Sequence, residues 1–331
     1  MKPAKPYLLN CITFFLLAII FQSCSDQSGA WKNEEINSGK REHFHELNEQ
    51  AFKSLKANNP KQLGALLSRD LIDNEVSTKR MVELISNQLN DNKYKLLDEY
   101  YVINSYIDAD TIQTTAKDIN SHNLNYPGTT RMMYIALFIP DAGENKYMVS
   151  LIYSKFNYGW KISQWDLSPY TINGKTAPEL FKYAKEQYSK TYLIDAVNTM
   201  ALAITCTQPS SIWHYICEAD ISDFYNKLIN KANDKYKFPF TLNQVATKPR
   251  IFRIFNQTTP EGSYPMVYYL SQIKLNDTTA IKNENEQIKK IIGEAMPGID
   301  KDKKYILYSA FNVKPGGGKT VDHYDINEKL P

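Results

Sequence analysis

Two short stretches of this sequence combine residue types that could do chemistry. The first, Glu42-His43-Phe44-His45-Glu46, offers carboxylates and imidazoles, which are common metal ligands. On a helix His43 and His45 point about 200° apart and cannot share an ion, while Glu42 and Glu46 share a solvated face. We therefore predict a solvent-facing charge cluster here and no metal site.

The second stretch, Pro315-Gly316-Gly317-Gly318-Lys319-Thr320, has the glycines and the lysine of a phosphate-binding loop. That pattern requires a glycine five positions before Gly318, where this sequence has Val313. The residues that follow are strand-like, so no helix N-terminus is available to hold a phosphate. We predict a hairpin turn between the last two strands instead.

The remaining ionisable residues give no catalytic arrangement. Asp108 and Asp110 flank a predicted strand turn, and His122 is predicted to lie in a polar loop of Asn and Ser, so none of them offers a desolvated base. The histidines, at 43, 45, 122, 214 and 323, are scattered and form no Ser–His–Asp or Cys–His set. We predict no catalytic residue and no cofactor.

The composition is that of a globular protein. The chain has 331 residues, 43% hydrophobic and 23% charged, which is enough material for two domains. Its 23 Tyr, 14 Phe and 4 Trp exclude a largely disordered chain. The net charge of +3 falls to +1 without Lys2 and Lys5, since the first 23 residues contain no acid. We therefore predict no nucleic-acid partner.

The N-terminus has the order of a secretory signal. Lys2 and Lys5 precede an apolar run over residues 8–21, which is shorter than the ~20 apolar residues that a spanning helix needs. The run closes on Phe21-Gln22-Ser23-Cys24, which resembles the lipobox of bacterial lipoproteins, in a relaxed form typical of the Bacteroidota.

The resemblance implies that residues 1–23 are removed, that Cys24 becomes the lipidated N-terminus and that residues 24–39 form a polar tether. The protein would then be anchored by its lipid to the outer membrane of the cell envelope, on the periplasmic or the surface face. The alternative is a plain cleaved signal with an incidental cysteine.

Residues 40–168 are predicted to form the first domain. Apolar residues recur at helical spacing over 41–55 and 78–89, and Asn59-Pro60 starts a short helix between them. The period then changes to two, which predicts strands over 94–105, 111–117, 131–139, 146–155 and 159–167. Helices followed by an antiparallel meander give an α+β arrangement.

Gly159-Trp160-Lys161-Ile162, followed by Trp165, resembles the last strand of nuclear transport factor 2-like domains. The resemblance covers residues 40–168 and implies three helices and a bent antiparallel sheet that forms a cone. It implies no activity, because that family contains enzymes, binding domains and spacers. A cavity in the cone would be lined by Tyr134, Tyr147, Tyr153 and Trp160. Aromatic residues on strands are more often plain core.

A turn-rich connection over 168–174 leads to a capping box formed by Thr176 and Glu179. Residues 176–331 are predicted as a second α+β domain of no recognised family. We expect a long helix that includes 193–204, then helices over 218–232 and 278–292 and strands over 249–256, 266–275, 304–313 and 320–324. The two domains are expected to fold independently.

Cys206 and Cys217 remain after Cys11 leaves with the signal and Cys24 takes the lipid. The segment between them contains Gln208-Pro209-Ser210-Ser211, which could fold back and bring the two sulfurs together in an oxidising envelope. We favour a disulfide, worth about 2–3 kcal/mol, over two independent buried thiols.

These features predict a lipid-anchored envelope protein that acts as a non-catalytic binding or accessory module. Its partners would be the membrane, through the lipid, and an envelope protein or a small ligand. The alternatives are an enzyme or small-ligand carrier that uses the cone pocket, and a structural member of an envelope complex. A buried carboxylate or histidine in an enclosed pocket would favour the enzyme, whereas a filled cone would favour a partner surface.

Overall fold

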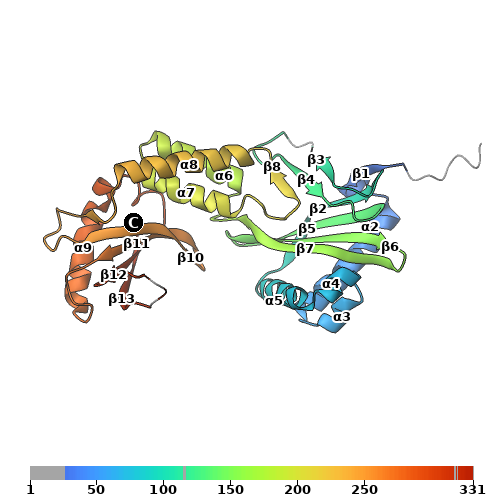
Figure 1. Cartoon of the computed structure of the whole chain (residues 1–331), viewed down its shortest axis with the longest axis horizontal. Helices are drawn as coiled ribbons and strands as arrows, with labels where there is room; N and C mark the ends of the chain where they lie inside the picture. Colours follow the sequence, from blue (N-terminus) through green and yellow to red (C-terminus); the bar gives the residue numbers. More distant parts are fainter. Residues whose placement is uncertain (1–26, 115–116, 317, 319, 331) are drawn as a thin grey trace, which may run out of the picture.

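A computed structural model describes residues 27–114, 117–316, 318 and 320–330 of this chain. In these residues the predicted α+β class is confirmed, with eight α-helices and three mostly antiparallel sheets. Figure 1 shows an elongated molecule with one large sheet on the right, a second on the left, and helices α6, α7 and α8 across the top. The predicted signal and Cys24 lie outside the described residues.

The helices follow the apolar periodicity of the sequence. Asn59 caps α3 by accepting a hydrogen bond from the backbone of Gln62, and Glu179 accepts from the backbone of Thr176 at 2.8 Å, so the predicted capping box forms. The helices are α2 (Ser38–Lys56), α3 (Pro60–Gly64), α4 (Arg69–Asp73), α5 (Glu75–Asp91), α6 (Ala177–Ser189), α7 (Leu193–Thr205), α8 (Glu218–Lys235) and α9 (Thr278–Ala295), with a 3-10 turn η1 (Asn33–Glu35).

The single long helix predicted after Thr176 is wrong, because two helices occupy this segment. Thr191 has a φ of 67°, and a residue in this left-handed conformation cannot continue a right-handed helix. The chain therefore turns between α6 and α7, and the two helices pack against each other.

The first sheet has the order β1-β2-β5-β6-β7 and is antiparallel throughout. Alternate residues bury both of its faces: Tyr134 and Tyr153 pack beneath α2, whereas Met133 and Ile135 join the core with α6, α7 and α8. The strands are β1 (Gly29–Lys32), β2 (Tyr94–Ile103), β5 (Met132–Pro140), β6 (Lys146–Phe156) and β7 (Gly159–Thr171).

A three-stranded sheet joins the two halves of the chain. It contains β3 (Asp110–Gln113), β4 (His122–Tyr126) and β8 (Trp213–Tyr215), and β8 comes from the connection between α7 and α8. The polar loop predicted around His122 is wrong: His122 lies on β4, is 7% exposed and stacks on Trp213 with ring centroids 3.4 Å apart. Independent folding of the two predicted domains stays a prediction. Separation of the domains would remove the pairing of β8 with β4.

The second sheet has the order β13-β12-β11-β10-β9. Strands β11 and β12 are parallel because α9 connects them, and the other pairs are antiparallel. The last two strands pair as predicted, through a connection over residues 312–322, and Gly317 and Lys319 of the predicted turn lie outside the described residues. The strands are β9 (Phe240–Thr241), β10 (Arg250–Thr259), β11 (Gly262–Leu270), β12 (Tyr305–Phe311) and β13 (His323–Lys329).

The helices cover one face of the second sheet, and the opposite face carries a smaller cluster centred on Tyr264, Met266 and Leu307. None of the described helices is both long and apolar enough to cross a bilayer.

Candidate functional site

A buried polar centre, the Glu99 centre, lies between α2 and the first sheet. Glu99 is on β2 and has no exposed surface. Arg41, His45 and Asn48 recur at i, i+4 and i+7 along α2, so all three point from one helix face towards the sheet. Tyr134 on β5 completes the centre.

The Glu99 carboxylate is fully occupied by hydrogen-bond donors. Arg41 Nε lies 2.5 Å from Oε1, His45 Nε2 lies 3.0–3.1 Å from both oxygens, and the Tyr134 hydroxyl donates to Oε2 at 2.6 Å. Asn48 Nδ2 in turn donates to the Tyr134 hydroxyl at 3.0 Å. The hydrogen bond to Glu99 raises the pKa of Arg41, and burial together with Glu99 raises the pKa of Tyr134.

The prediction for residues 42–46 therefore needs a correction. Phe44 is buried and His45 turns towards Glu99, so only Glu42, His43 and Glu46 form a solvent-facing cluster. The sequence of α2 alone does not show this contact, because Glu99 comes from a strand more than fifty residues later. No group of three His, Cys, Asp or Glu side chains that could hold a metal ion occurs in the described part of the chain.

The aromatic residues predicted to line a cavity are divided between core and surface. Tyr134 and Tyr153 have no exposed surface, and Phe44 stacks on Tyr134 with ring centroids 4.0 Å apart. Trp160 is half-buried and meets Phe44 edge-on, whereas Tyr147 is 37% exposed. Beside this core lies an open groove of about 320 Å³ lined by His45, Asn48, Glu49, Phe52, Tyr94, Leu96 and Phe138.

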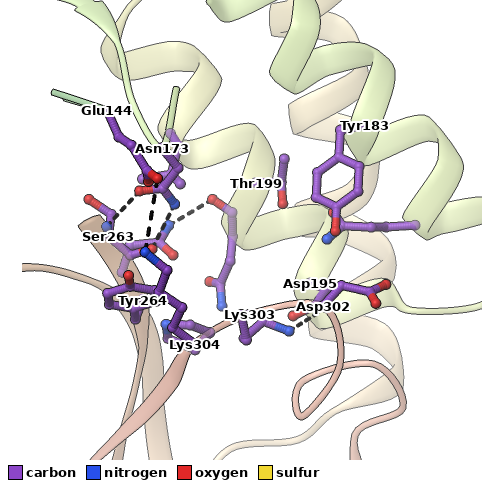
Figure 2. Close-up of a pocket in the computed structure, with 15 residues that line it drawn as sticks. Glu144, Asn173, Tyr183, Asp195, Thr199, Ser263, Tyr264, Asp302, Lys303 and Lys304 are labelled. Carbon is purple, nitrogen blue, oxygen red and sulfur yellow. Dashed lines mark hydrogen bonds and ion pairs between the residues drawn. The ribbon is translucent and has the colours of Figure 1, made fainter. Parts of the chain in front are cut away.

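A second site, the junction pocket, lies where the two halves of the chain meet, and it holds about 200 Å³. Figure 2 shows Asn173, from the turn after β7, beside Ser263 and Tyr264 of β11, with Tyr183 of α6 and Asp195 of α7 on the opposite side. Asn173 binds β11 twice, through Nδ2 to the Ser263 carbonyl at 2.9 Å and through Oδ1 from the Ser263 amide at 2.7 Å. These bonds fix the first sheet to the second at the edge of the pocket.

A buried ion pair forms one wall of the junction pocket. Asp195 is 3% exposed, and Lys303 Nζ lies 2.9 Å from its Oδ2. Lys303 also donates to the carbonyl oxygens of Gly298 and Lys301, so three oxygens surround its ammonium group. Burial raises the pKa of Asp195 to about 6 although Lys303 opposes the shift.

The other wall residues are rich in side-chain amides that are incompletely paired. Gln187 and Asn198 are 6% and 7% exposed, and Gln187 Oε1 and Asn198 Nδ2 have no hydrogen-bond partner among the described residues. Buried polar atoms normally have a partner, so these two atoms leave the hydrogen-bond network behind the pocket surface incomplete. The sequence does not predict this pocket, because its walls come from segments around residues 144, 173, 195, 256, 263 and 303.

The predicted disulfide is not formed in the structure, in which Cys206 and Cys217 are both free. Cys206 is buried at the end of α7 and its thiol donates to the Leu202 carbonyl, and Cys217 precedes α8. The segment between them extends into β8 and pairs with β4, so it does not fold back as a tight loop. Thiol titration of the unfolded mature protein would find both thiols in this state and neither in the bonded one.

Comparison with known protein families, with curated proteins and with solved structures finds no match to this chain.

Proposed function

We propose that this protein is a lipid-anchored envelope protein that works as a non-catalytic binding module, with the junction pocket as its ligand site. The observation that carries the proposal is a pocket of about 200 Å³ whose wall combines a buried ion pair, side-chain amides and two tyrosines. The lipid anchor is inferred from the order of charge, apolar run and small residue before Cys24.

We infer that residues 40–168 form a nuclear transport factor 2-like domain, which acts here as a support. The packing of α2, α3 and α5 against one face of an antiparallel sheet favours this assignment. The space between helix and sheet is filled by Phe44, Tyr134 and Tyr153, so the cone offers little room for a ligand.

The chemistry of the junction pocket favours a small neutral molecule with several hydroxyl groups, of monosaccharide size. Its volume of about 200 Å³ is below the ~300–1,000 Å³ of pockets for drug-sized ligands. Asp195 pairs with Lys303 and Glu144 with Lys304, which leaves Asp302 as the remaining charge of the lining, so the pocket disfavours an anionic ligand. Side-chain amides both donate and accept, as hydroxyl groups do, and Tyr183 and Tyr264 add flat apolar surfaces.

A thermal-shift panel on the purified full mature chain tests the proposal. We would titrate glucose, galactose, mannose and N-acetylglucosamine, with glycine and glutamate as charged comparisons. A ligand at 100 times its dissociation constant stabilises the folded state by about 2.7 kcal/mol, which a melting curve detects readily.

Two lysine variants provide a matched control for this panel. Lys304 lines the pocket and Lys301 does not, and their side chains are 59% and 58% exposed. Lys304→Ala should reduce the sugar-dependent shift, and Lys301→Ala should leave it unchanged. A shift with amino acids alone would show that the ligand class is wrong, and the absence of any shift would refute the ligand site.

The membrane anchor has its own test. Cys24→Ala should release the protein from the membrane fraction of its host, because it removes the cysteine that would carry the lipid. Retention of this variant after a carbonate wash would refute the lipid anchor.

A second candidate function is catalysis at the Glu99 centre. A buried carboxylate holds His45 Nε2, and the side chain of His45 is 42% exposed beside the open groove, so Nδ1 could accept a proton from a bound molecule. Within the described chain, however, His45 is bonded only to Glu99, and no hydroxyl or thiol nucleophile is bonded to it. An activity screen in which His45→Asn abolishes turnover would favour this candidate.

A further inference from the structure

One end of the first sheet, the anchor end, is where the N-terminal segment joins the fold. Gly29 at the start of β1 is the antiparallel partner of Ile103 at the end of β2. The chain before Gly29 therefore leaves the sheet at the end where β2 finishes. Cys24 lies five residues before Gly29, and five extended residues reach at most about 18 Å. A lipid on Cys24 would keep the anchor end within that distance of the bilayer surface.

The loop that follows β2 at this end presents two apolar side chains to solvent. Tyr106 is 84% exposed and Ile107 is 71% exposed. The base of the loop is held firmly, because the Gly128 amide donates to the Asp108 carbonyl at 2.9 Å. A Cβ at Gly128 would lie 2.0 Å from that oxygen, so only glycine permits this approach. The apolar tip is therefore carried on a fixed base.

The turn between β6 and β7 lies at the same end. Ile103 pairs with Met132 at the start of β5, and the next residue of β5, Met133, pairs with Ser154 near the end of β6. The strand β6 then ends at the pair Phe156–Gly159, and Figure 1 shows β1 and the β6–β7 turn on the same side of the sheet. Phe156 and Tyr158 stack there with ring centroids 5.0 Å apart. The basic side chains beside them, Arg131 and Lys155, are exposed.

We propose that the anchor end is a membrane-contacting surface, with Tyr106 and Ile107 inserted into the headgroup region of the bilayer that carries the lipid anchor. Exposed aromatic and aliphatic side chains favour a membrane interface, and at this end Arg131 and Lys155 offset the acidic Asp108 and Asp110 of the loop. We take a bilayer as the partner of this surface, because a lipid on Cys24 would keep the bilayer within about 18 Å of Gly29. This inference rests on the proposed lipid anchor.

The contact has a consequence for the ligand site. The junction pocket lies at the other end of the first sheet, where Glu144 and Asn173 mark the turns before β6 and after β7. Insertion of the anchor end would therefore direct the junction pocket and the second sheet away from the bilayer, where a water-borne ligand can reach them.

Quenching by brominated lipid tests the membrane contact. Ile107→Trp and Val313→Trp would each be made in the full lipidated protein and incorporated into phosphatidylethanolamine–phosphatidylcholine vesicles, with or without brominated phosphatidylcholine. The two positions are 71% and 65% exposed, and Val313 follows β12 in the second sheet, far from the anchor end. We expect the bromolipid to remove about half of the emission added at position 107, because an interfacial apolar side chain is buried about 5–10 Å into the boundary between headgroups and acyl chains.

The control variant should gain emission that the bromolipid leaves unchanged. Equal quenching at 107 and 313, or none at 107, would overturn the proposal. Emission at 107 that is shielded from aqueous iodide but not quenched by bromolipid would show a protein at this surface and would also overturn it. If Cys24→Ala remains in the membrane fraction, the lipid anchor fails and the membrane contact falls with it, whereas quenching at 107 alone can fail while the anchor stands.

Discussion

Glu99 and Asp195 are both buried carboxylates. Their surroundings differ, and the difference separates a centre that stabilises the fold from a site that can bind a ligand. Glu99 is bonded by a guanidinium, an imidazole and a phenol, and it lies in a filled core. Asp195 has one cation, Lys303, and lines an open pocket. A buried carboxylate with three donors holds a fold together, whereas one with a single cation at the wall of a pocket can receive a ligand.

The pKa of Asp195 supports this contrast. Its rise to about 6 means that the folded protein compensates the buried charge only in part. A polar ligand that fills the junction pocket would supply part of the missing solvation.

Removal of the Glu99 carboxylate should have the largest effect on stability. Glu99→Ala leaves Arg41 and the Tyr134 hydroxyl without their acceptor, so we expect a loss of about 4 kcal/mol in the free energy of unfolding. Urea unfolding measures the loss. Glu49→Ala, on the exposed side of α2, is the control and should change stability by about 0.5 kcal/mol or less. A loss below about 1 kcal/mol for Glu99→Ala would show that this centre is not structural.

The pH dependence of stability should isolate Asp195. Its pKa is raised from 3.8 to about 6 on folding, so the folded state binds the proton more tightly than the unfolded state. This contribution to stability is therefore fully present below pH 4 and is lost as the pH rises through 6. We expect the unfolding free energy of the wild type, relative to Asp195→Asn, to fall by about 2 kcal/mol between pH 4 and pH 7. A constant difference over that range would contradict the assignment.

A smaller effect should distinguish two tyrosines that face each other across β5 and β6. Tyr134 and Tyr153 are register partners with no exposed surface, but only the Tyr134 hydroxyl is hydrogen-bonded. Tyr134→Phe should cost about 2 kcal/mol, because it removes a hydrogen bond to a charged group. Tyr153→Phe removes an unpaired buried hydroxyl and should be neutral or stabilising. Equal losses in thermal unfolding would show that packing, not the Glu99 centre, governs this core.

The extent to which sequence predicts this molecule depends on how local each signal is. The stripe of Phe44, Leu47, Ala51 and Leu55 predicted α2, and period-two patterns predicted β5, β6 and β7, because one segment carries each signal. Strands β1 and β8 were missed because they are short and acquire their structure from a partner strand. The break between α6 and α7 was missed because Lys190 and Thr191 carry no helix-stop signal.

The two buried centres differ in the same respect. Glu99 has the same parity along β2 as Tyr101 and Ile103, which face the core beneath α2, so an inward carboxylate could have been read from the sequence. The junction pocket offered no such signal. Its residues become neighbours only when the turns of the first sheet, α6, α7 and the second sheet assemble.

The most direct test of the central claim is a calorimetric titration of the most stabilising sugar of the panel into Asp195→Asn and Tyr134→Phe. The Asn variant keeps the shape of the wall but removes the charge that a hydroxyl group would approach, so its affinity should fall about 10-fold or more, the equivalent of one hydrogen bond to a charged group. Tyr134→Phe disturbs only the Glu99 centre, so its affinity should equal that of the wild type. An unchanged affinity in Asp195→Asn together with a loss in Tyr134→Phe would contradict the account and place the ligand beneath α2.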